Sequence, residues 1–222
     1  AKTADDKASM VNVAAADLEV KVSNINTTYG TVKDSEANDY KTSYTLLNGD
    51  SSDGITIDHA TAAYYTKDGK KYTADASATA YGVKTNLTGD VLSNYNVTKD
   101  AASTITIGKA KLTVDTTKNL TYGQTTPTGI NADGEYTTKI TAGLANGDTE
   151  LSILNKSDEY DKNLDSKTAA GRVTANVGSY ATNVESATST NVNGKTNTGN
   201  YEITAKTADD KASMVNVAAA DL

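Results

Sequence analysis

Acidic residues in two short stretches are the first candidates for chemistry in this sequence. NGDSSDG contains Asp50 and Asp53, and KSDEYDK contains Asp158 and Asp161. Calcium takes several oxygen ligands, and loops rich in Asp, Asn and Gly can supply them. Neither stretch has the regular alternation of an EF-hand loop or of a nonapeptide calcium repeat. The pattern therefore favours solvated loops without a cofactor, with calcium at these four residues as the alternative.

Catalytic chemistry is not indicated by the remaining residue types. His59 is the only histidine, and the chain has no Cys. Catalytic triads and most zinc sites need a histidine together with partner residues. The sequence also has no GxSxG, GxGxxG or phosphate-binding loop. We therefore predict that the chain is not an enzyme and that His59 is a surface residue.

Tyrosine and asparagine are the candidates for contact with sugars. Tyr64 and Tyr65 are adjacent on an expected strand, so one should face inward and the other outward. An outward Tyr65 near Tyr72 could stack on a sugar ring, although tyrosines at such positions more often shield a sheet. Five sequons for N-glycosylation also occur, and several are expected by chance in a chain rich in Asn and Thr. They begin at Asn26, Asn86, Asn96, Asn119 and Asn155.

The overall composition favours many short strands joined by tight loops. The chain has 222 residues, enough for one or two domains, with 13 Tyr but no Phe and no Trp. Thr and Tyr favour strands, whereas Asn, Asp and Gly favour turns. The net charge of −7 argues against nucleic acid as a partner, because binding phosphates needs a basic face. No apolar run approaches the length of a membrane span, so membrane insertion is not expected.

The most informative feature of the sequence is an exact duplication. Residues 1–18 and residues 205–222 both read AKTADDKASMVNVAAADL, which sets a period of 204 residues. Periods of this length are typical of tandem arrays, and a cloning artefact is the alternative. The identity predicts one array unit followed by the start of the next.

A weaker repeat divides the 204-residue unit into two modules. Four anchors recur in the same order: LEVKVSNINTTYG with KLTVDTTKNLTYG, YTLLNGD with AGLANGD, SNYNVT with GNYEIT, and STITIGKAKL with SMVNVAAADL. We therefore predict a first β module at 18–111 and a second at 112–222, which ends in the repeated strand 205–222. Residues 1–17 are then the last strand of a preceding module.

The duplicated stretch also has helical features, with Thr3 as a cap and acidic residues in the first turn. Its counterpart TITIG, in which Ile105 and Ile107 alternate with Thr, is typical of a strand, so we predict strand for both. Elsewhere the pattern is β throughout. The predicted strands are 18–22, 42–47, 55–58, 61–66, 77–85, 91–98, 103–107, 112–116, 136–141, 150–154, 172–177, 180–186, 200–205 and 213–217.

The junction between the predicted modules is short. Gly108, Lys109 and Ala110 alone separate two strands, and no linker rich in Pro or in Gly and Ser is present. A strand that runs nearly straight into the next domain leaves little freedom. We therefore expect tandem, elongated β-sandwich-like modules that form a rod or filament. Strands of about ten residues, at about 3.3 Å for each residue, correspond to about 35–45 Å for each module. A 204-residue unit of two modules is then about 70–90 Å long.

At these anchors the chain resembles the MBG and YDG repeat domains of large secreted bacterial adhesins, including filamentous-haemagglutinin-like proteins. The first module departs from the pattern, with LLNGDSSDG where the second has GLANGDTE. The resemblance implies an extracellular, mostly β stalk at the bacterial cell surface that carries no catalytic residues. The resembling stretches are AKLTV, ADLEV, both copies of TYG, GLANGDTE, VGSYATNV, SNYNV and GNYEI.

Two functions follow from this resemblance and the repeats. In the first, the chain is a structural repeat unit of an extracellular adhesin stalk or surface filament, and its partners are neighbouring repeats of the same chain. In the second, the repeat module itself binds host or matrix glycans, with avidity from many weak sites. Residues 1–18 could also complete a sheet in another molecule, so self-assembly through this strand is a further expectation.

Overall fold

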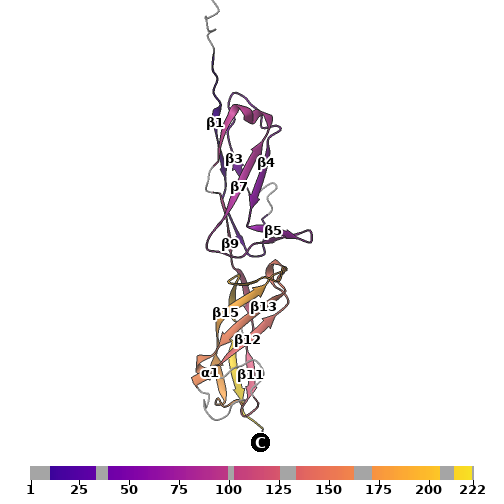
Figure 1. Cartoon of the computed structure of the whole chain (residues 1–222). Helices are drawn as coiled ribbons and strands as arrows, with labels where there is room; N and C mark the ends of the chain where they lie inside the picture. The colour runs from indigo at the N-terminus through magenta and orange to yellow at the C-terminus, as the bar shows by residue number, and fades with distance from the viewer. Residues whose placement is uncertain are drawn as a thin grey trace, which may run out of the picture. The chain divides into compact units, whose positions relative to one another are not determined.

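The computed structural model describes residues 11–33, 40–99, 103–125, 134–162, 172–205 and 213–221. The described chain is predominantly β, which confirms the predicted all-β fold class (Figure 1). The chain forms two compact units, and each draws on separate stretches of sequence. Unit 1 comprises Ala1–Ile25, Lys33–Ala62 and Tyr81–Ile105, and unit 2 comprises Asn26–Val32, Ala63–Ala80 and Thr106–Leu222.

Unit 1 is built from short strands in which apolar residues alternate with polar ones. In β1, Leu18 and Val20 are almost fully buried, whereas the residues between them are exposed, as expected for a strand with one face on a core. This strand pairs in parallel with β8, and Figure 1 shows β4 beside its antiparallel partner β7. The strands are β1 (Ala16–Val22), β3 (Thr42–Ser43), β4 (Thr56–Thr61), β7 (Tyr81–Thr88) and β8 (Tyr95–Lys99), and the 3-10 turn is η1 (Asp90–Asn94).

Two strands contain residues of both units, namely β2 (Ile25–Thr28) and β9 (Thr104–Gly108). They belong to a four-stranded sheet with the order β2-β9-β7-β4, and β1 lies in a second sheet with the order β3-β1-β8. Ile105 and Ile107 of β9 are buried, and their polar neighbours are not. The alternation of TITIG therefore predicted this strand correctly.

Unit 2 contains most of the remaining strands and the one α-helix that the described residues form. Its largest sheet has the order β12-β13-β15-β16, and Figure 1 shows β12, β13 and β15 side by side. A second sheet places β18 between β11 and β14, and β10 pairs in parallel with β17. The elements are β5 (Tyr64–Lys67), β6 (Lys70–Thr73), β10 (Ala110–Val114), β11 (Lys118–Thr121), β12 (Glu135–Ile140), η2 (Ala145–Gly147), β13 (Glu150–Lys156), α1 (Asp158–Lys162), β14 (Gly178–Ala181), β15 (Asn183–Thr190), β16 (Thr196–Thr198), β17 (Tyr201–Ala205) and β18 (Met214–Ala218).

Tyrosines take the place of Phe and Trp in the core of unit 2. Tyr136 and Tyr160 are among the largest fully buried side chains. A buried tyrosine must place its hydroxyl on a partner, and the Tyr136 hydroxyl donates to the carbonyl of Thr116 at 2.7 Å. The tyrosines therefore serve as apolar filling and as cross-links to the backbone. The core cluster consists of Leu120, Tyr136, Tyr160, Val173, Ala175, Tyr180, Val215 and Val217.

Several elements depart from the sequence expectation. The strands β2 and β11 lie in stretches that look polar, β6 belongs to a two-stranded sheet, and β16 is the edge strand of a four-stranded sheet. The predicted strand 172–177 is absent, because this segment forms only an isolated bridge between Arg172 and Thr125. The acidic stretch predicted as a loop contains α1 instead.

Where both copies of the duplicated stretch are described, residues 11–14 and 215–218 differ in structure. In the second copy, Met214–Ala218 is strand β18, which confirms the strand prediction there and excludes the helical alternative for these residues. Val215 is 0% exposed in β18. In the first copy, residues 11–15 form no strand, and Val11 is 90% exposed. The rest of this predicted strand, residues 1–10, lies outside the described residues.

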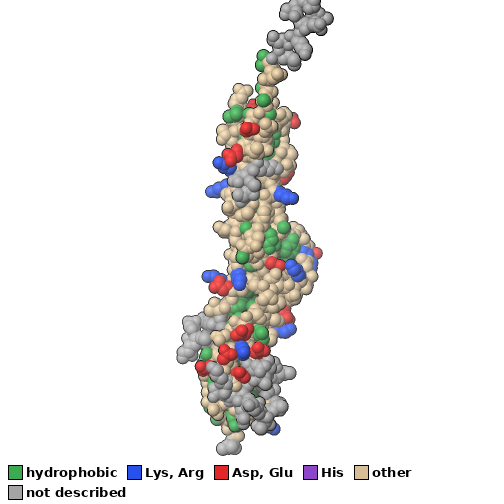
Figure 2. Space-filling view, turned by 60° about the vertical axis from the view of Figure 1, so that its left-hand side comes forward, with side chains coloured by type: hydrophobic (Ala, Val, Ile, Leu, Met, Phe, Trp, Pro, Cys, Tyr) green, Lys and Arg blue, Asp and Glu red, His purple; other side chains and the backbone are tan. Residues whose placement is uncertain are grey.

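Charged side chains of both signs are interspersed on the face that Figure 2 shows. Among the described residues, no helix combines the length and the apolar character that are needed to cross a membrane.

Candidate functional site

The most elaborate polar site of unit 2 is built on a tight turn, Ala145–Asp148. Asn146 and Gly147 both adopt the left-handed conformation, with φ of 55° and 69°. Asn and Gly are the residues that tolerate this conformation best. The turn closes with a 3.0 Å hydrogen bond from the Asp148 amide to the Ala145 carbonyl. It thereby directs the Asp148 carboxylate inward, where it is 8% exposed.

Two tyrosines from distant parts of the chain share this carboxylate. The Tyr29 hydroxyl donates to Oδ1 of Asp148 at 2.8 Å, across 119 positions of sequence. The Tyr201 hydroxyl donates to Oδ2 at 3.0 Å and accepts the Ala145 amide at 2.9 Å. The two rings meet edge to face, with 5.7 Å between their centroids. Tyr29, Ala145–Asp148 and Tyr201 are called the tyrosine–aspartate corner below.

Asn146 fastens the hairpin β5–β6 to this corner. Its side-chain oxygen accepts the Thr73 amide at 2.9 Å, and its side-chain nitrogen donates to the Thr73 carbonyl at 2.9 Å. The Gly30 amide also donates to the Thr73 hydroxyl at 3.0 Å. A paired amide of this kind replaces a neighbouring strand, because it satisfies both backbone groups of one residue.

A second polar cluster connects the start of β17 to the segment after β6. The Asn200 side chain accepts the Ala76 amide at 2.9 Å and donates to the Asp75 carboxylate at 3.0 Å. The Lys195 ammonium donates to the other oxygen of Asp75 at 3.0 Å. Asn200 is 1% exposed, so its hydrogen bonds are made in a largely dry environment.

Unit 1 contains a turn of the same design. Asn48 and Gly49 are left-handed, with φ of 56° and 76°, and the Asp50 amide donates to the Leu47 carbonyl at 3.0 Å. The Tyr95 hydroxyl donates to Asp50 Oδ2 at 2.8 Å and accepts the Leu47 amide at 2.8 Å. This turn is more open, since Leu47 is 52% exposed.

Burial controls the electrostatics of the tyrosine–aspartate corner. It raises the pKa of the Asp148 carboxyl, because the ionised form loses its hydration, although the hydroxyls of Tyr29 and Tyr201 act in the opposite direction. Burial also raises the pKa of both tyrosines, and the nearby Asp148 charge adds to this effect. The two phenols are therefore neutral donors at physiological pH.

The raised pKa of Asp148 predicts a pH-dependent stability. A carboxyl whose pKa is higher in the folded state favours folding most below its unfolded pKa, near 4, and loses that contribution as the pH rises through the folded value. We expect Asp148→Asn to remove this dependence while keeping one of the two acceptor oxygens. The free energy of unfolding of both proteins, measured from pH 4 to pH 8, checks this.

The expected sign is specific. The stability of the native protein relative to Asp148→Asn should fall from acidic to neutral pH. Parallel curves, or a native protein that gains relative stability with rising pH, would contradict the raised pKa.

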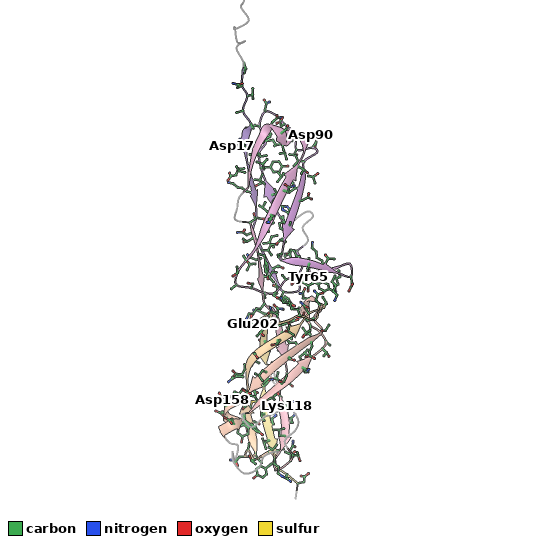
Figure 3. All side chains as sticks on the ribbon, in the orientation of Figure 1. Asp17, Tyr65, Asp90, Lys118, Asp158 and Glu202 are labelled. Carbon is green, nitrogen blue, oxygen red and sulfur yellow. The ribbon has the colours of Figure 1, made fainter. Side chains whose placement is uncertain are left out.

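The four acidic residues named as alternative calcium ligands do not gather into a site. Nowhere in the described ranges do three or more histidine or acidic side chains lie close enough to hold a metal ion. Asp50 is engaged by Tyr95, and Asp53 lies in an exposed turn with its amide on the Ser51 hydroxyl. Asp158 forms an ion pair with Lys156 at 3.5 Å at the start of α1, where Figure 3 labels it. Asp161 lies in the same helix, and its backbone amide donates to the carbonyl of Ser157.

Tyr65 and Tyr72 are brought together as the sequence predicted, but their rings face each other. They are directly opposite in the hairpin β5–β6, with ring centroids 5.5 Å apart, and Figure 3 labels Tyr65 on this hairpin. Both are half-buried. A Cβ atom built on Gly147 would lie 2.8 Å from the Tyr72 ring, so this ring packs on the corner turn. Tyr64 is half-buried as well, so the simple alternation of inward and outward rings does not hold.

The five sequons differ in accessibility. Asn155 is 0% exposed, and its side-chain nitrogen donates to the carbonyl of Ile153 and to the hydroxyl of Thr138. A glycan cannot be attached to this side chain in the folded protein, so Asn155 is removed from the candidates. The exposed sequon residues are Asn26, Asn86, Asn96 and Asn119.

His59 is half-buried rather than a free surface residue. Its ring stacks on Tyr40 at 4.5 Å, and its two nitrogens lie 2.9 Å from the Thr85 hydroxyl and 3.4 Å from the Thr42 hydroxyl. Burial lowers the pKa of His59, and the nearby Asp58 charge only partly opposes this. The residue therefore has a packing role in unit 1.

Sequence reasoning did not predict the tyrosine–aspartate corner as a site. Its parts were visible in the recurring anchors, namely NGD and the tyrosines at 29, 122, 95 and 201. That Asp148 accepts from two of them was not visible, because the partners are far apart in sequence. The corner can fasten segments together and offers no nucleophile beside a base. Comparison of the chain with family models, with curated proteins and with solved structures found no match.

Proposed function

We propose that this chain is a structural repeat unit of an extracellular bacterial adhesin stalk or surface filament. In this function the modules follow one another in a tandem array, and each is completed by its neighbour. The proposal combines the repeat period of the sequence with the resemblance to adhesin repeat domains. The polar sites described above serve to hold strands and turns in place.

One observation carries this proposal. The same sequence, VNVA, belongs to the central strand β18 at residues 215–218 and is an exposed segment at residues 11–14. Val215 and Val217 are 0% and 3% exposed in β18, whereas the identical Val11 and Val13 are each 90% exposed. Two valines spaced for one sheet face and left in water fit a segment that becomes a strand only when a sheet lies beside it. In an array with a period of 204 residues, residues 11–14 of one unit are the β18 of the unit before it.

The experiment is a series of chains with one, two and four units at this period, in which residues 1–204 are repeated and residues 205–222 close the last unit. The expected result is a stiff particle in electron micrographs whose length grows by about 70–90 Å for each unit. Compact or freely jointed particles would contradict the stalk.

The same chains test glycan binding, which is the alternative function. We expect no binding of single or multiple units on a glycan array. Sugar binding that is lost on Tyr65→Ala, with the fold retained, would replace the stalk with an adhesive module. The stacking of Tyr65 on Tyr72 argues against this outcome, because one face of the Tyr65 ring is already covered by protein.

A further inference from the structure

The motif Thr-Tyr-Gly occurs twice and adopts the same turn both times. In the first copy, the Thr31 amide donates to the Thr28 carbonyl at 2.8 Å. In the second copy, the Gln124 amide donates to the Thr121 carbonyl at 3.1 Å. The glycines are left-handed in both turns, with φ of 85° at residue 30 and 77° at residue 123.

The two tyrosines also have the same neighbouring strand end. The Tyr29 amide donates to the Gly108 carbonyl at the end of β9, at 2.8 Å. The Tyr122 amide donates to the Ala218 carbonyl at the end of β18, at 2.9 Å. The backbone at Tyr122 therefore has the same turn and the same kind of neighbouring strand end as the backbone at Tyr29.

The surroundings of the two motifs differ completely. Tyr29 is 2% exposed and bonded to Asp148, whereas Tyr122 is 47% exposed. A Cβ atom on Gly30 would lie 2.6 Å from the backbone nitrogen of Asn146, whereas a Cβ atom on Gly123 would meet nothing within 4 Å. The second motif thus has the same backbone turn as the first but does not pack on a turn like Ala145–Asp148.

A turn of the required kind is exposed in unit 1. Leu47–Asp50 with Tyr95 reproduces the hydrogen bonds of Ala145–Asp148 with Tyr201, at nearly the same distances. Asp148 accepts from two tyrosines, whereas Asp50 accepts from Tyr95 alone in the described part of the chain. Leu47 is 52% exposed on this turn.

Strand register shows how these two exposed features meet in an array. Ala110 lies two positions after Gly108 and is directly opposite Tyr201. Ala16 is directly opposite Tyr95 in the same parallel arrangement. In a chain with a period of 204 residues, the Ala16 of the next copy is residue 220 of this one, two positions after Ala218.

The same chain path that places Tyr29 beside Tyr201 therefore places Tyr122 beside the Tyr95 of the following copy. We propose that Tyr122 of each copy docks on the Leu47–Asp50 turn of the next copy and donates its hydroxyl to Asp50. This inference rests on the proposed tandem array and adds the contact that joins its units. The partner is a second copy of this chain.

The test uses a two-copy chain in which residues 1–204 are followed directly by residues 1–222. Tyr122→Phe in the second copy leaves one Tyr122, in the first copy. Tetranitromethane nitrates tyrosines that are accessible and can ionise, and mass spectrometry of the peptides locates the modified residue. We expect nitration of this Tyr122 to be at least about tenfold slower than in the single chain, because burial beside a carboxylate disfavours the phenolate.

Variants in one copy at a time identify the partner. Asp50→Ala in the second copy should restore nitration of the first-copy Tyr122, whereas Asp50→Ala in the first copy should not. Gly123→Ala provides a readout that leaves the Asp50 turn intact. In the first copy its methyl group would strike the docked turn and restore nitration, and in the second copy it should only cost the strain of a left-handed Ala.

The outcomes separate this inference from the proposed function. If Tyr122 is nitrated equally fast in the single and two-copy chains while electron micrographs show a stiff particle of doubled length, the docking is overturned and the stalk remains. If protection persists in the second-copy Asp50→Ala and the first-copy Gly123→Ala variants, Tyr122 is covered by another surface and the proposal fails. If the particle does not lengthen stiffly, the stalk itself is refuted.

Discussion

Val215→Asp should unfold unit 2, whereas Val11→Asp, the same change in the same local sequence, should leave stability unchanged. Val215 is 0% exposed and lies on β18, between Lys118 of β11 and Tyr180 of β14. A carboxyl group there loses its hydration and removes apolar packing, which costs more than about 4 kcal/mol. Val11 is 90% exposed, so the same group stays in water and changes stability by less than about 0.5 kcal/mol.

Amide hydrogen exchange followed by mass spectrometry measures both effects in one experiment. Peptides from β11 and β14 should lose protection in Val215→Asp and keep it in Val11→Asp. Loss of protection in both variants would mean that the first copy of the duplicated stretch is already bound within this chain. Val13→Asp and Val217→Asp form a second matched pair, with the same expectation.

Asp148→Ala should lower the free energy of unfolding of unit 2 by about 3 kcal/mol, because it removes the acceptor of two buried hydroxyls. The hydroxyl of Tyr29 then loses the acceptor of its hydrogen bond, Oδ1 of Asp148. The hydroxyl of Tyr201 can turn to the Ala145 carbonyl at 3.2 Å, which limits the loss at this second position. Thermal or urea unfolding, followed by the near-ultraviolet signal of the tyrosines, measures the change.

Unit 1 provides the matched control. Asp50→Ala removes the same carboxylate from the same kind of turn, but Tyr95 keeps the Leu47 carbonyl at 3.2 Å as an acceptor. We expect a loss below about 1 kcal/mol there. Equal losses in the two variants would show that Tyr29 contributes nothing at the tyrosine–aspartate corner. Tyr29→Phe alone should reproduce most of the difference between them.

Elements with strong local signals could be predicted from the sequence. Strand β9 follows from the alternation of TITIG, and β1 from that of LEVKV. The hairpin turn at Asp68 and Gly69 and the left-handed Asn146 follow from residue types that tolerate positive φ. These features depend on interactions between near neighbours in the chain, which the order of residues specifies directly.

Elements that depend on distant partners could not be predicted. The strands β2 and β11 have weak alternation and exist because β9 and β18 lie beside them. The acidic stretch from Asp158 forms a helical turn, whose amide at Tyr160 is bonded to the Ser157 hydroxyl. The carboxylate of Asp148 meets Tyr29 only because the fold brings together residues 119 positions apart.

The duplicated stretch separates the two kinds of information most clearly. Its sequence determined that two valines, alternating with polar residues, can form one buried face of a strand. Whether that strand forms was decided by tertiary structure alone. Residues 214–218 lie between β11 and β14, whose backbone groups and apolar faces pair with them, and they are a buried strand. Residues 11–14 have the same side chains but pair with no strand of the described chain, so burial cannot offset the entropy of ordering, and their valines stay in water.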